Sequence, residues 1–382
     1  MHSRDRLTVL LLASAGSVHT ARWAAELGAA GHDVVVASWR PGPQLPGADL
    51  RVAPAVSASP LWRLPLAAMW LRRLVRAVQP DVVHVHSLGT YALLSLALPR
   101  NPARVLSPYG SELRSARRSA IRATVIRLAL RRADLVLPCS AEVAAEVTGR
   151  YAVPAERAPI LSWGVSADLI AARPSISARA VRSEFGIPAD ATVVLSIRST
   201  AATYRVLQVV EAFAQAAADQ PGLFLVLLGG ARPERESGRR SQQAYLDGAR
   251  AATRHIRDRV MILGPALSRE RTFELMCASD AAVSIPAADH HSYSVLEAAL
   301  AGCRLLLADI APYREMTGDG MVAELLPEPI VSELARRLRL AATEPRDRDV
   351  NQGFILTREH GAGKLAEHVQ IYRRLTAART AR

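Results

Sequence analysis

The chain has 382 residues, of which 50% are hydrophobic and 22% are charged. These proportions exclude an intrinsically disordered chain, and the length suggests two domains or one large one. The formal net charge is +13, and every basic residue except Lys364 is an arginine. Such a charge favours anionic partners, among them nucleotide diphosphates and acidic lipid surfaces. An arginine-rich proteome explains the same excess without any partner.

Cys139, Cys277 and Cys303 form no CxxC pair and have no histidine at a ligand-like spacing. We therefore expect reduced, structural thiols, a cytoplasmic protein and no metal site. No apolar run reaches the roughly 18 residues that a transmembrane helix needs. A basic start followed by the apolar run 7–12 has the outline of a signal peptide. We interpret this run as a buried first strand, because a helical pattern follows it at once.

Short apolar runs then alternate with helical patterns. The sequence predicts strands at 7–12, 33–38, 81–86, 104–107 and 135–138, and helices at 19–30, 60–78, 88–98 and 117–132. The pattern breaks at 151–190, where four prolines and little periodicity indicate the interdomain linker and the entry to the second domain. Alternation then restarts, with strands at 192–197, 223–228, 260–263, 281–285 and 304–308 and helices at 206–218, 269–279 and 294–301.

Two such series predict an α/β protein with two doubly wound parallel sheets. The expected boundaries are an N-terminal domain over 1–170, a C-terminal domain over 171–360, and a last helix, 361–382, returning to the first domain. Ligands bind at the carboxyl ends of parallel strands, so we expect a site in a cleft between two facing sheets.

Segment 284–315 carries the strongest chemical signal. Asp289 falls in the loop after a predicted strand, and Glu297 falls in the first turn of the next predicted helix. Free N–H groups at a helix start suit a phosphate, and a carboxylate can accept hydrogen bonds from two vicinal sugar hydroxyls. Two isolated acids here would be a solvated pair that the helix dipole stabilises.

The acids are part of a longer pattern, which resembles the donor-binding signature of the family 4 glycosyltransferases. The pattern consists of an acid, seven residues, Glu-Ala, Ala-Gly, an apolar strand and Arg-Glu. Further resemblances follow in the family's order: His19, Arg22-Trp23, Gly31-His32, the PDVVHVH segment 80–86, Ala133-Asp134, Ser140, Trp163-Gly164-Val165, Ala212-Phe213, Gly229-Gly230 and Ala278-Ser279-Asp280. No single one of these is specific, but their order and spacing are.

The resemblance implies the GT-B fold, with two Rossmann-like domains facing across a cleft. It also implies a retaining, metal-independent and hexosyltransferase-like enzyme without a cofactor, active in polysaccharide or glycoconjugate biosynthesis. Such an enzyme moves a sugar from a nucleotide diphosphate sugar to a hydroxyl of a glycan, glycolipid or natural product. Neither the base and sugar of the donor nor the acceptor can be named from the sequence.

In this family the first acid contacts the donor sugar and the second holds the ribose hydroxyls. The resemblance gives these roles to Asp289 and Glu297. The family usually has Glu at the first position, and Asp is shorter by about 1.5 Å. Further donor-binding candidates are Gly230, Ser294, Val295 and Leu296.

The family also places an arginine after the first strand of its second domain and a lysine about six residues later, both on the leaving diphosphate. Arg198 matches the arginine. The lysine position holds Tyr204, followed by Arg205. Either Arg205 replaces the lysine, or Tyr204 gives a hydroxyl to phosphate.

In the first domain, the segment from Ser107 to Glu112 resembles a family motif that carries His or Trp where this chain has Tyr109. Tyrosine has a pKa of about 10 and is a poor base near neutrality. This suits a front-face reaction, in which the leaving phosphate accepts the acceptor's proton. Catalytic candidates are therefore Arg198, Asp289, Tyr109 and His86, although a lone histidine such as His86 is more often packed or capping. Acceptor-side candidates are Gly16, His19, Gly110 and Glu112, with helix capping the stronger expectation for Glu112.

Arginines alternate with apolar residues over the predicted helix at 114–132. This pattern suits peripheral contact with an anionic surface, here the inner face of the membrane, and equally suits a solvated helix face. No reader motif points to nucleic acid.

Two other functions stay open. A GT-B-like epimerase would need further acids around the sugar, which the sequence lacks. A non-catalytic or partner-dependent sugar-nucleotide binder would explain why Asp289, Tyr204 and Tyr109 all depart from the family pattern.

Overall fold

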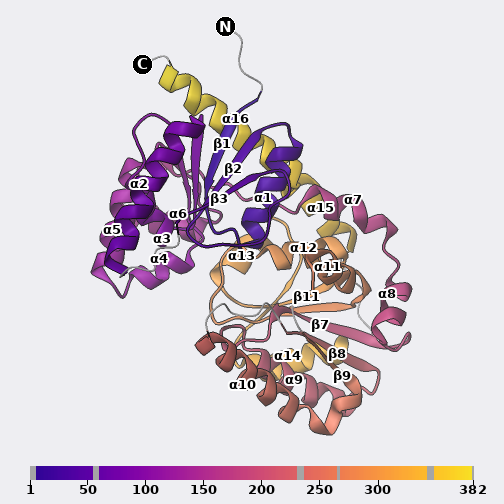
Figure 1. Ribbon diagram of the computed structural model, residues 1–382. Coiled ribbons are helices and arrows are strands. Elements are labelled where there is room, and N and C mark those ends of the chain that lie inside the picture. The colour runs from indigo at the N-terminus through magenta and orange to yellow at the C-terminus, as the bar shows by residue number, and fades with distance from the viewer. Residues whose placement is uncertain (1–5, 55–59, 230–235, 265–266, 342–347, 381–382) are drawn as a thin grey trace. The chain divides into compact units, whose positions relative to one another are not determined.

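The computed structural model describes residues 6–54, 60–229, 236–264, 267–341 and 348–380. The chain forms two compact units (Figure 1). The first unit comprises residues 1–163 and 362–382, and the second comprises 164–361. Each unit contains one six-stranded parallel sheet with helices packed around it.

The sheet of the first unit has the strand order β3-β2-β1-β4-β5-β6. Its strands are β1 (Thr8–Leu12), β2 (Asp33–Ser38), β3 (Asp49–Val52), β4 (Val82–His86), β5 (Ala103–Ser107) and β6 (Leu135–Val136). Its helices are α1 (Val18–Ala29), α2 (Pro60–Val78), α3 (Thr90–Ser95), α4 (Ser111–Ala116), α5 (Ala120–Arg132), α6 (Ala141–Tyr151) and α16 (Gly361–Thr380). Strands β4 and β5 are buried throughout, as expected for parallel strands covered on both faces.

The sheet of the second unit has the order β12-β11-β10-β7-β8-β9. Its strands are β7 (Thr192–Ser199), β8 (Leu223–Leu228), β9 (Val260–Leu263), β10 (Ala281–Ser284), β11 (Arg304–Ala308) and β12 (Glu324–Leu326). The helices are α7 (Ala167–Ala172), α8 (Ala178–Phe185), α9 (Val206–Asp219), α10 (Glu236–Ala252), α11 (Arg269–Ala278), α12 (Tyr293–Ala301), α13 (Ala311–Gly318), α14 (Ile330–Leu340) and α15 (Arg348–Arg358).

Both sheets share one topology. In each, the chain starts near the middle, builds outward over three strands, and then returns to build the other half. The reversal lies between β1 and β4 in the first sheet and between β7 and β10 in the second. At such a reversal, the loops that leave neighbouring strands diverge and open a crevice at the carboxyl ends. The fold therefore marks two places where functional side chains should gather.

The structure differs from the sequence-based expectations at three places. The helix predicted over 117–132 begins only at Ala120, as α5, because the Ser119 hydroxyl accepts from the amide of Arg122 and caps the start of the helix; a separate short helix, α4, precedes it. Segment 151–190, expected to hold the linker and the entry to the second domain, also contains the short helices α7 and α8, which were not predicted. Strand β3 was not predicted, because its sequence DLRV is polar and half-exposed at a sheet edge.

No helix in the described part of the chain is long and apolar enough to cross a membrane.

Helix α16 packs against the rest of the first unit (Figure 1), and a cluster of histidine and aromatic rings attaches it there. The Tyr372 hydroxyl on α16 lies 2.6 Å from Nδ1 of His84, whose Nε2 lies 2.7 Å from the Ser107 hydroxyl. One turn earlier on α16, the His368 ring meets the edge of Trp23 at a centroid distance of 4.6 Å. These side chains are almost completely buried. The C-terminal helix is therefore part of the core of the first unit.

Burial keeps the histidines of this cluster neutral. It lowers the pKa of His86 to about 3 and that of His368 to about 4, and it holds the pKa of His84 well below its ordinary value. The positive charge that each ring would acquire adds to this effect on its neighbours. Nδ1 of His368 donates to the backbone carbonyl of Lys364, which fixes its tautomer.

This cluster makes the first unit sensitive to acid. In the unfolded chain the histidines bind protons near pH 6.5, whereas in the folded chain they stay neutral to about pH 4. The unfolded state therefore binds more protons in this window, and the free energy of unfolding should fall as the pH drops below about 6.5. Urea unfolding, monitored by tryptophan fluorescence, measures this free energy for the first unit, because all five tryptophans lie there.

His368→Gln should flatten this pH dependence, whereas the exposed His255→Gln should leave it unchanged. If the free energy of unfolding depends on pH with the same slope in both variants, the cluster does not control stability in acid.

Candidate functional site

Charged side chains gather at the topological reversal of the second sheet. Arg198 is the penultimate residue of β7, and Asp289 lies in the loop after β10. The Arg198 guanidinium lies 3.4 Å from Oδ1 of Asp289, and its Nη1 donates to the Ser292 hydroxyl at 2.8 Å. The two side chains are only 15% and 13% exposed. Two residues that sequence reasoning assigned to one site thus meet where the topology favours a ligand.

Tyr313 holds the other oxygen of Asp289. Its hydroxyl, from helix α13, donates to Oδ2 of Asp289 at 2.8 Å and lies 2.8 Å from the Ser284 hydroxyl. Because a tyrosine has one hydroxyl proton, Ser284 donates to Tyr313 in this chain of hydrogen bonds. Burial, followed by the nearby Asp289 carboxylate, raises the pKa of Tyr313 and keeps it a neutral donor. Sequence reasoning missed Tyr313, because no spacing links it to Asp289.

The surroundings of Arg198 keep it charged. Burial by itself would lower the pKa of this guanidinium, but Asp289, Tyr204 and Tyr313 outweigh burial and raise it. The guanidinium carbon lies 4.3 Å from the centre of the Tyr204 ring, within range of a cation–π interaction. The site therefore presents a permanent, oriented cation.

Tyr204 and Arg205 have different surroundings. Tyr204 stacks under Arg198, whereas Nη1 of Arg205 lies 2.9 Å from Oε1 of Glu328. Arg205 has a left-handed backbone with φ of 53° where α9 begins. Of the two candidates for the lysine position, the structure brings Tyr204 to Arg198 and pairs Arg205 with Glu328.

Glu297 lies on α12, whose N-terminus follows the Asp289 loop. The helix begins at Tyr293, so Glu297 is its fifth residue and lies just beyond the first turn in which it was expected. The Glu297 carboxylate accepts from Nε of Arg269 on α11 at 3.2 Å, and its side chain is 13% exposed. Sequence reasoning missed Arg269 as well, because it lies 28 residues away.

The remaining donor-side candidates divide into two groups. The side chains of Val295 and Leu296 lie in the hydrophobic core, and their amides donate to the Ser292 carbonyl. They can shape the site only through the backbone of α12. Ser294 is half-buried in the first turn of the helix. Gly230 lies outside the described residues.

The first unit has a different kind of site at its own reversal. His86 ends β4, and its Nδ1 lies 3.2 Å from the Tyr109 hydroxyl. The rings of His19, Tyr109 and Trp163 lie close to one another, with centroid distances of 5.3 to 5.7 Å. His86 is 2% exposed. The structure thus brings together His19, His86 and Tyr109 in a largely aromatic setting.

Glu112 holds backbone in this unit. Its Oε1 accepts from the amides of Tyr109 at 2.7 Å and of Leu88 at 2.9 Å, and the side chain is buried. Gly110, with φ of 92°, precedes α4 and makes this turn possible. Gly16 is exposed in the turn after β1.

Within the described residues, no group of three or more His, Cys, Asp and Glu side chains could hold a metal ion.

Two family models match the chain. Residues 16–169 match the model described as Glycosyltransferase Family 4, and residues 177–352 match Glycosyl transferases group 1. Together they span most of the sequence. None of the curated proteins matches it.

Solved structures share the fold at low sequence identity. Sucrose-phosphate synthase from Thermosynechococcus elongatus is 17% identical with a TM-score of 0.78, covering 98% of this chain and 100% of that one. Anabaena HepE in complex with UDP and glucose is 16% identical with a TM-score of 0.75, covering 96% and 99%. WaaG, a glycosyltransferase involved in lipopolysaccharide biosynthesis, is 18% identical with a TM-score of 0.71, covering 96% and 99%.

These structures confirm the expected GT-B fold, with two Rossmann-like α/β domains. With both family models matched in order along the sequence, the chain belongs to the family 4 glycosyltransferases, which transfer a sugar from a nucleotide sugar.

Proposed function

We propose that the chain is a retaining glycosyltransferase that binds a nucleotide diphosphate sugar in its second unit and transfers the sugar to an acceptor hydroxyl. The meeting of Arg198, Asp289 and the start of α12 at the sheet reversal carries this proposal. It offers a cation and a helix N-terminus to a diphosphate, with a carboxylate beside them for sugar hydroxyls.

Arg198 is the group that stabilises the leaving diphosphate. Negative charge develops on the phosphate as the sugar bond breaks, and a buried, already oriented cation stabilises this charge without reorganising. The loss of one such group typically lowers the rate about 10²–10³-fold. Tyr204 supports the role by packing its ring against the guanidinium.

Asp289 is the group that binds the donor sugar. Tyr313 and Arg198 each occupy one of its oxygens, and this orients the carboxylate. Each carboxylate oxygen has a second lone pair available to a sugar hydroxyl. An aspartate that these two contacts fix in place can therefore bind the sugar at a position where the family usually has the longer glutamate.

The neutral histidines support a front-face reaction. The pKa of His86, lowered to about 3 by burial, makes its imidazole a weak base at neutral pH. Tyr109 is also a poor base there. The departing phosphate then accepts the proton of the acceptor hydroxyl, which fits a retained anomeric configuration.

For the donor we propose a UDP-sugar, with a hexose as the transferred group. The support is a relative of the same fold, Anabaena HepE, whose structures hold UDP and UDP-glucose.

We also propose peripheral contact between the first unit and an anionic membrane surface. Ile121 and Leu128, two turns apart on α5, are 79% and 42% exposed, with Arg118, Arg122 and Arg131 around them. Exposed apolar side chains among arginines suit a lipid interface.

Glu297→Ala tests the ribose contact. A carboxylate that accepts from ribose hydroxyls makes charge-assisted hydrogen bonds, so its loss should weaken UDP binding about 10- to 100-fold. Titration calorimetry measures the dissociation constant, with the other nucleoside diphosphates as a panel. Glu270→Ala, an exposed acid on α11, is the matched control and should bind as the wild type does. Unchanged affinity in a folded Glu297→Ala protein would show that Glu297 does not bind the ribose.

Tyr313→Phe tests how Asp289 is held. Without the hydroxyl, Oδ2 of Asp289 loses a fixed partner and the carboxylate is less well oriented for the sugar. Affinity for the nucleotide sugar should fall about two- to tenfold, while affinity for the nucleoside diphosphate should stay the same. An equal loss for both ligands would point to damaged packing instead.

A further inference from the structure

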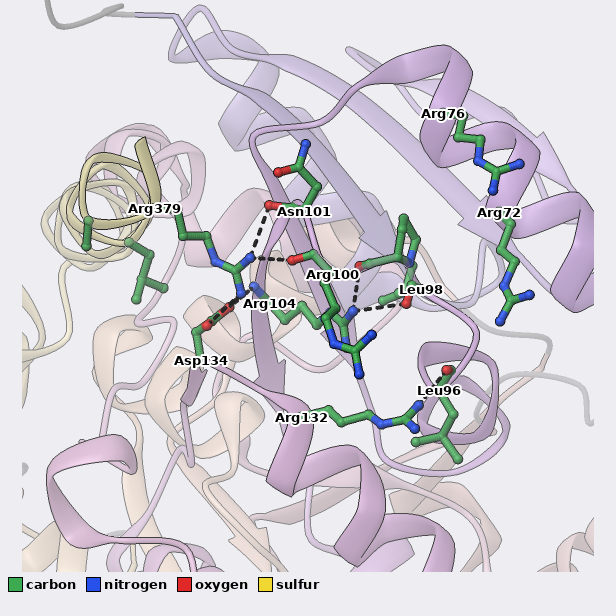
Figure 2. A pocket seen from close by; sticks show the side chains of 13 residues that line it. Arg72, Arg76, Leu96, Leu98, Arg100, Asn101, Arg104, Arg132, Asp134 and Arg379 are labelled. Atoms are coloured by element: carbon green, nitrogen blue, oxygen red, sulfur yellow. Dashed lines mark hydrogen bonds and ion pairs between the residues drawn. The ribbon is translucent and has the colours of Figure 1, made fainter. Parts of the chain in front are cut away.

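A second basic site lies in the first unit, away from the residues discussed so far (Figure 2). It is a pocket of about 840 Å³, a size that suits a small ligand. Six arginines contribute to its lining: Arg72, Arg76, Arg100, Arg104, Arg132 and Arg379. Asp134 is the one acid among the lining residues. Five positive charges therefore remain in excess.

The pocket lies at the opposite edge of the sheet from His86 and Tyr109. Arg104 is the second residue of β5, and Asp134 immediately precedes β6, so both mark the amino ends of their strands. His86 and Ser107 lie at the carboxyl ends of β4 and β5. A five-residue strand spans roughly 15 Å, which separates this pocket from the site at the carboxyl edge.

Three of the six arginines are held by groups that carry no net charge. Arg72 donates to the carbonyl of Ala97 at 2.8 Å, Arg132 to that of Leu96 at 2.7 Å, and Arg104 to that of Leu98 at 2.9 Å. Figure 2 shows Arg104 and Arg132 reaching the 96–101 segment from β5 and α5. A backbone carbonyl satisfies an N–H group but does not neutralise the guanidinium charge.

Asp134 is fully engaged elsewhere. It accepts two hydrogen bonds from Arg379, at 2.7 and 2.8 Å, and one from the amide of Arg104 at 2.7 Å. Arg379 also donates to the carbonyls of Arg100 and Asn101, which ties the end of α16 to this loop. The acid therefore compensates Arg379 and leaves the other five arginines.

Two features of Arg104 show that the pocket favours an anion. Arg104 is 5% exposed, yet its buried Nε has no hydrogen-bond partner within the described structure. Burial lowers the pKa of its guanidinium, and Arg379, Arg132 and Arg100 lower it further against the opposing effect of Asp134. A buried cation surrounded by like charges is costly unless an anion neutralises the group.

Helix ends explain only part of this charge. Arg132 and Arg379 lie in the last turns of α5 and α16, where a cation complements the helix dipole. A helix end carries about half an elementary charge, which is too little to offset five arginines. The side chains of Arg76 and Arg100 are exposed and make no ion pair with a described residue.

We propose that this pocket binds a phosphate-bearing anion, either a soluble phosphate compound or the phosphate headgroup of a lipid. Arginines present planar pairs of N–H groups that bind phosphate oxygens bidentately. Such a ligand would join α2, α5 and the 96–101 segment to the end of α16. It would thereby stabilise the attachment of the C-terminal helix.

Calorimetric titration of inorganic pyrophosphate at constant ionic strength tests the proposal. All proteins carry Arg198→Gln, so that a phosphate site in the second unit contributes little. Arg76→Ser with Arg100→Ser should weaken pyrophosphate binding at least about tenfold, because two charge-assisted contacts are lost. Both side chains are exposed, so folding should be unchanged, as thermal unfolding without ligand will verify. Arg254→Ser with Arg358→Ser removes the same charge from exposed positions outside the pocket and should bind normally.

Vesicle sedimentation distinguishes the two sources of phosphate. The same three proteins, the Arg198→Gln parent and its two double variants, are mixed with phosphatidylcholine vesicles that contain or lack phosphatidic acid. If the parent binds pyrophosphate but not phosphatidic acid vesicles, and the pocket variant loses this binding, the ligand is a soluble phosphate compound. If the parent binds phosphatidic acid vesicles and the pocket variant does not, the ligand is a lipid headgroup. The proposal is overturned if neither probe binds, or if both double variants lose binding equally.

Discussion

The candidate site of the second unit depends on one buried guanidinium, that of Arg198 at the carboxyl end of the central strand β7. Taking the Arg198 charge out of water is costly unless it is neutralised and hydrogen-bonded. Asp289 supplies the opposite charge, Ser292 accepts a hydrogen bond at the start of α12, and Tyr204 covers the face of the guanidinium. Tyr313 holds the other oxygen of Asp289 and completes the arrangement. The arrangement leaves a fixed cation beside a helix N-terminus, and this combination favours a diphosphate.

The first unit has histidine and tyrosine side chains at the corresponding reversal of its sheet. At its sheet reversal lie His86, Tyr109 and His19 rather than a charged pair. Burial among aromatic rings keeps His86 neutral, and the same cluster attaches α16 through His368 and Tyr372. One fold, used twice, therefore presents an arginine–aspartate pair at one sheet reversal and hydrogen-bonded rings at the other.

Much of this could be predicted from the sequence, for identifiable reasons. Most strands of these parallel sheets are continuous apolar runs, so 33–38, 223–228, 260–263 and 304–308 were predicted at their observed bounds. Strand β3 was missed because a polar edge strand lacks that pattern. Asp289 and Arg198 were found as candidates because each follows a strand in a recognisable motif. Tyr313 and Arg269 could not be found, because tertiary packing alone brings them to Asp289 and Glu297.

The most direct test of the account compares UDP with uridine on the wild type and on Arg198→Gln. If Arg198 binds the diphosphate, the substitution should weaken UDP about 10- to 100-fold in calorimetry and leave uridine unchanged, because only UDP carries the phosphates. If UDP and uridine weaken equally, or if UDP binding does not change, Arg198 does not hold the diphosphate and the donor site lies elsewhere.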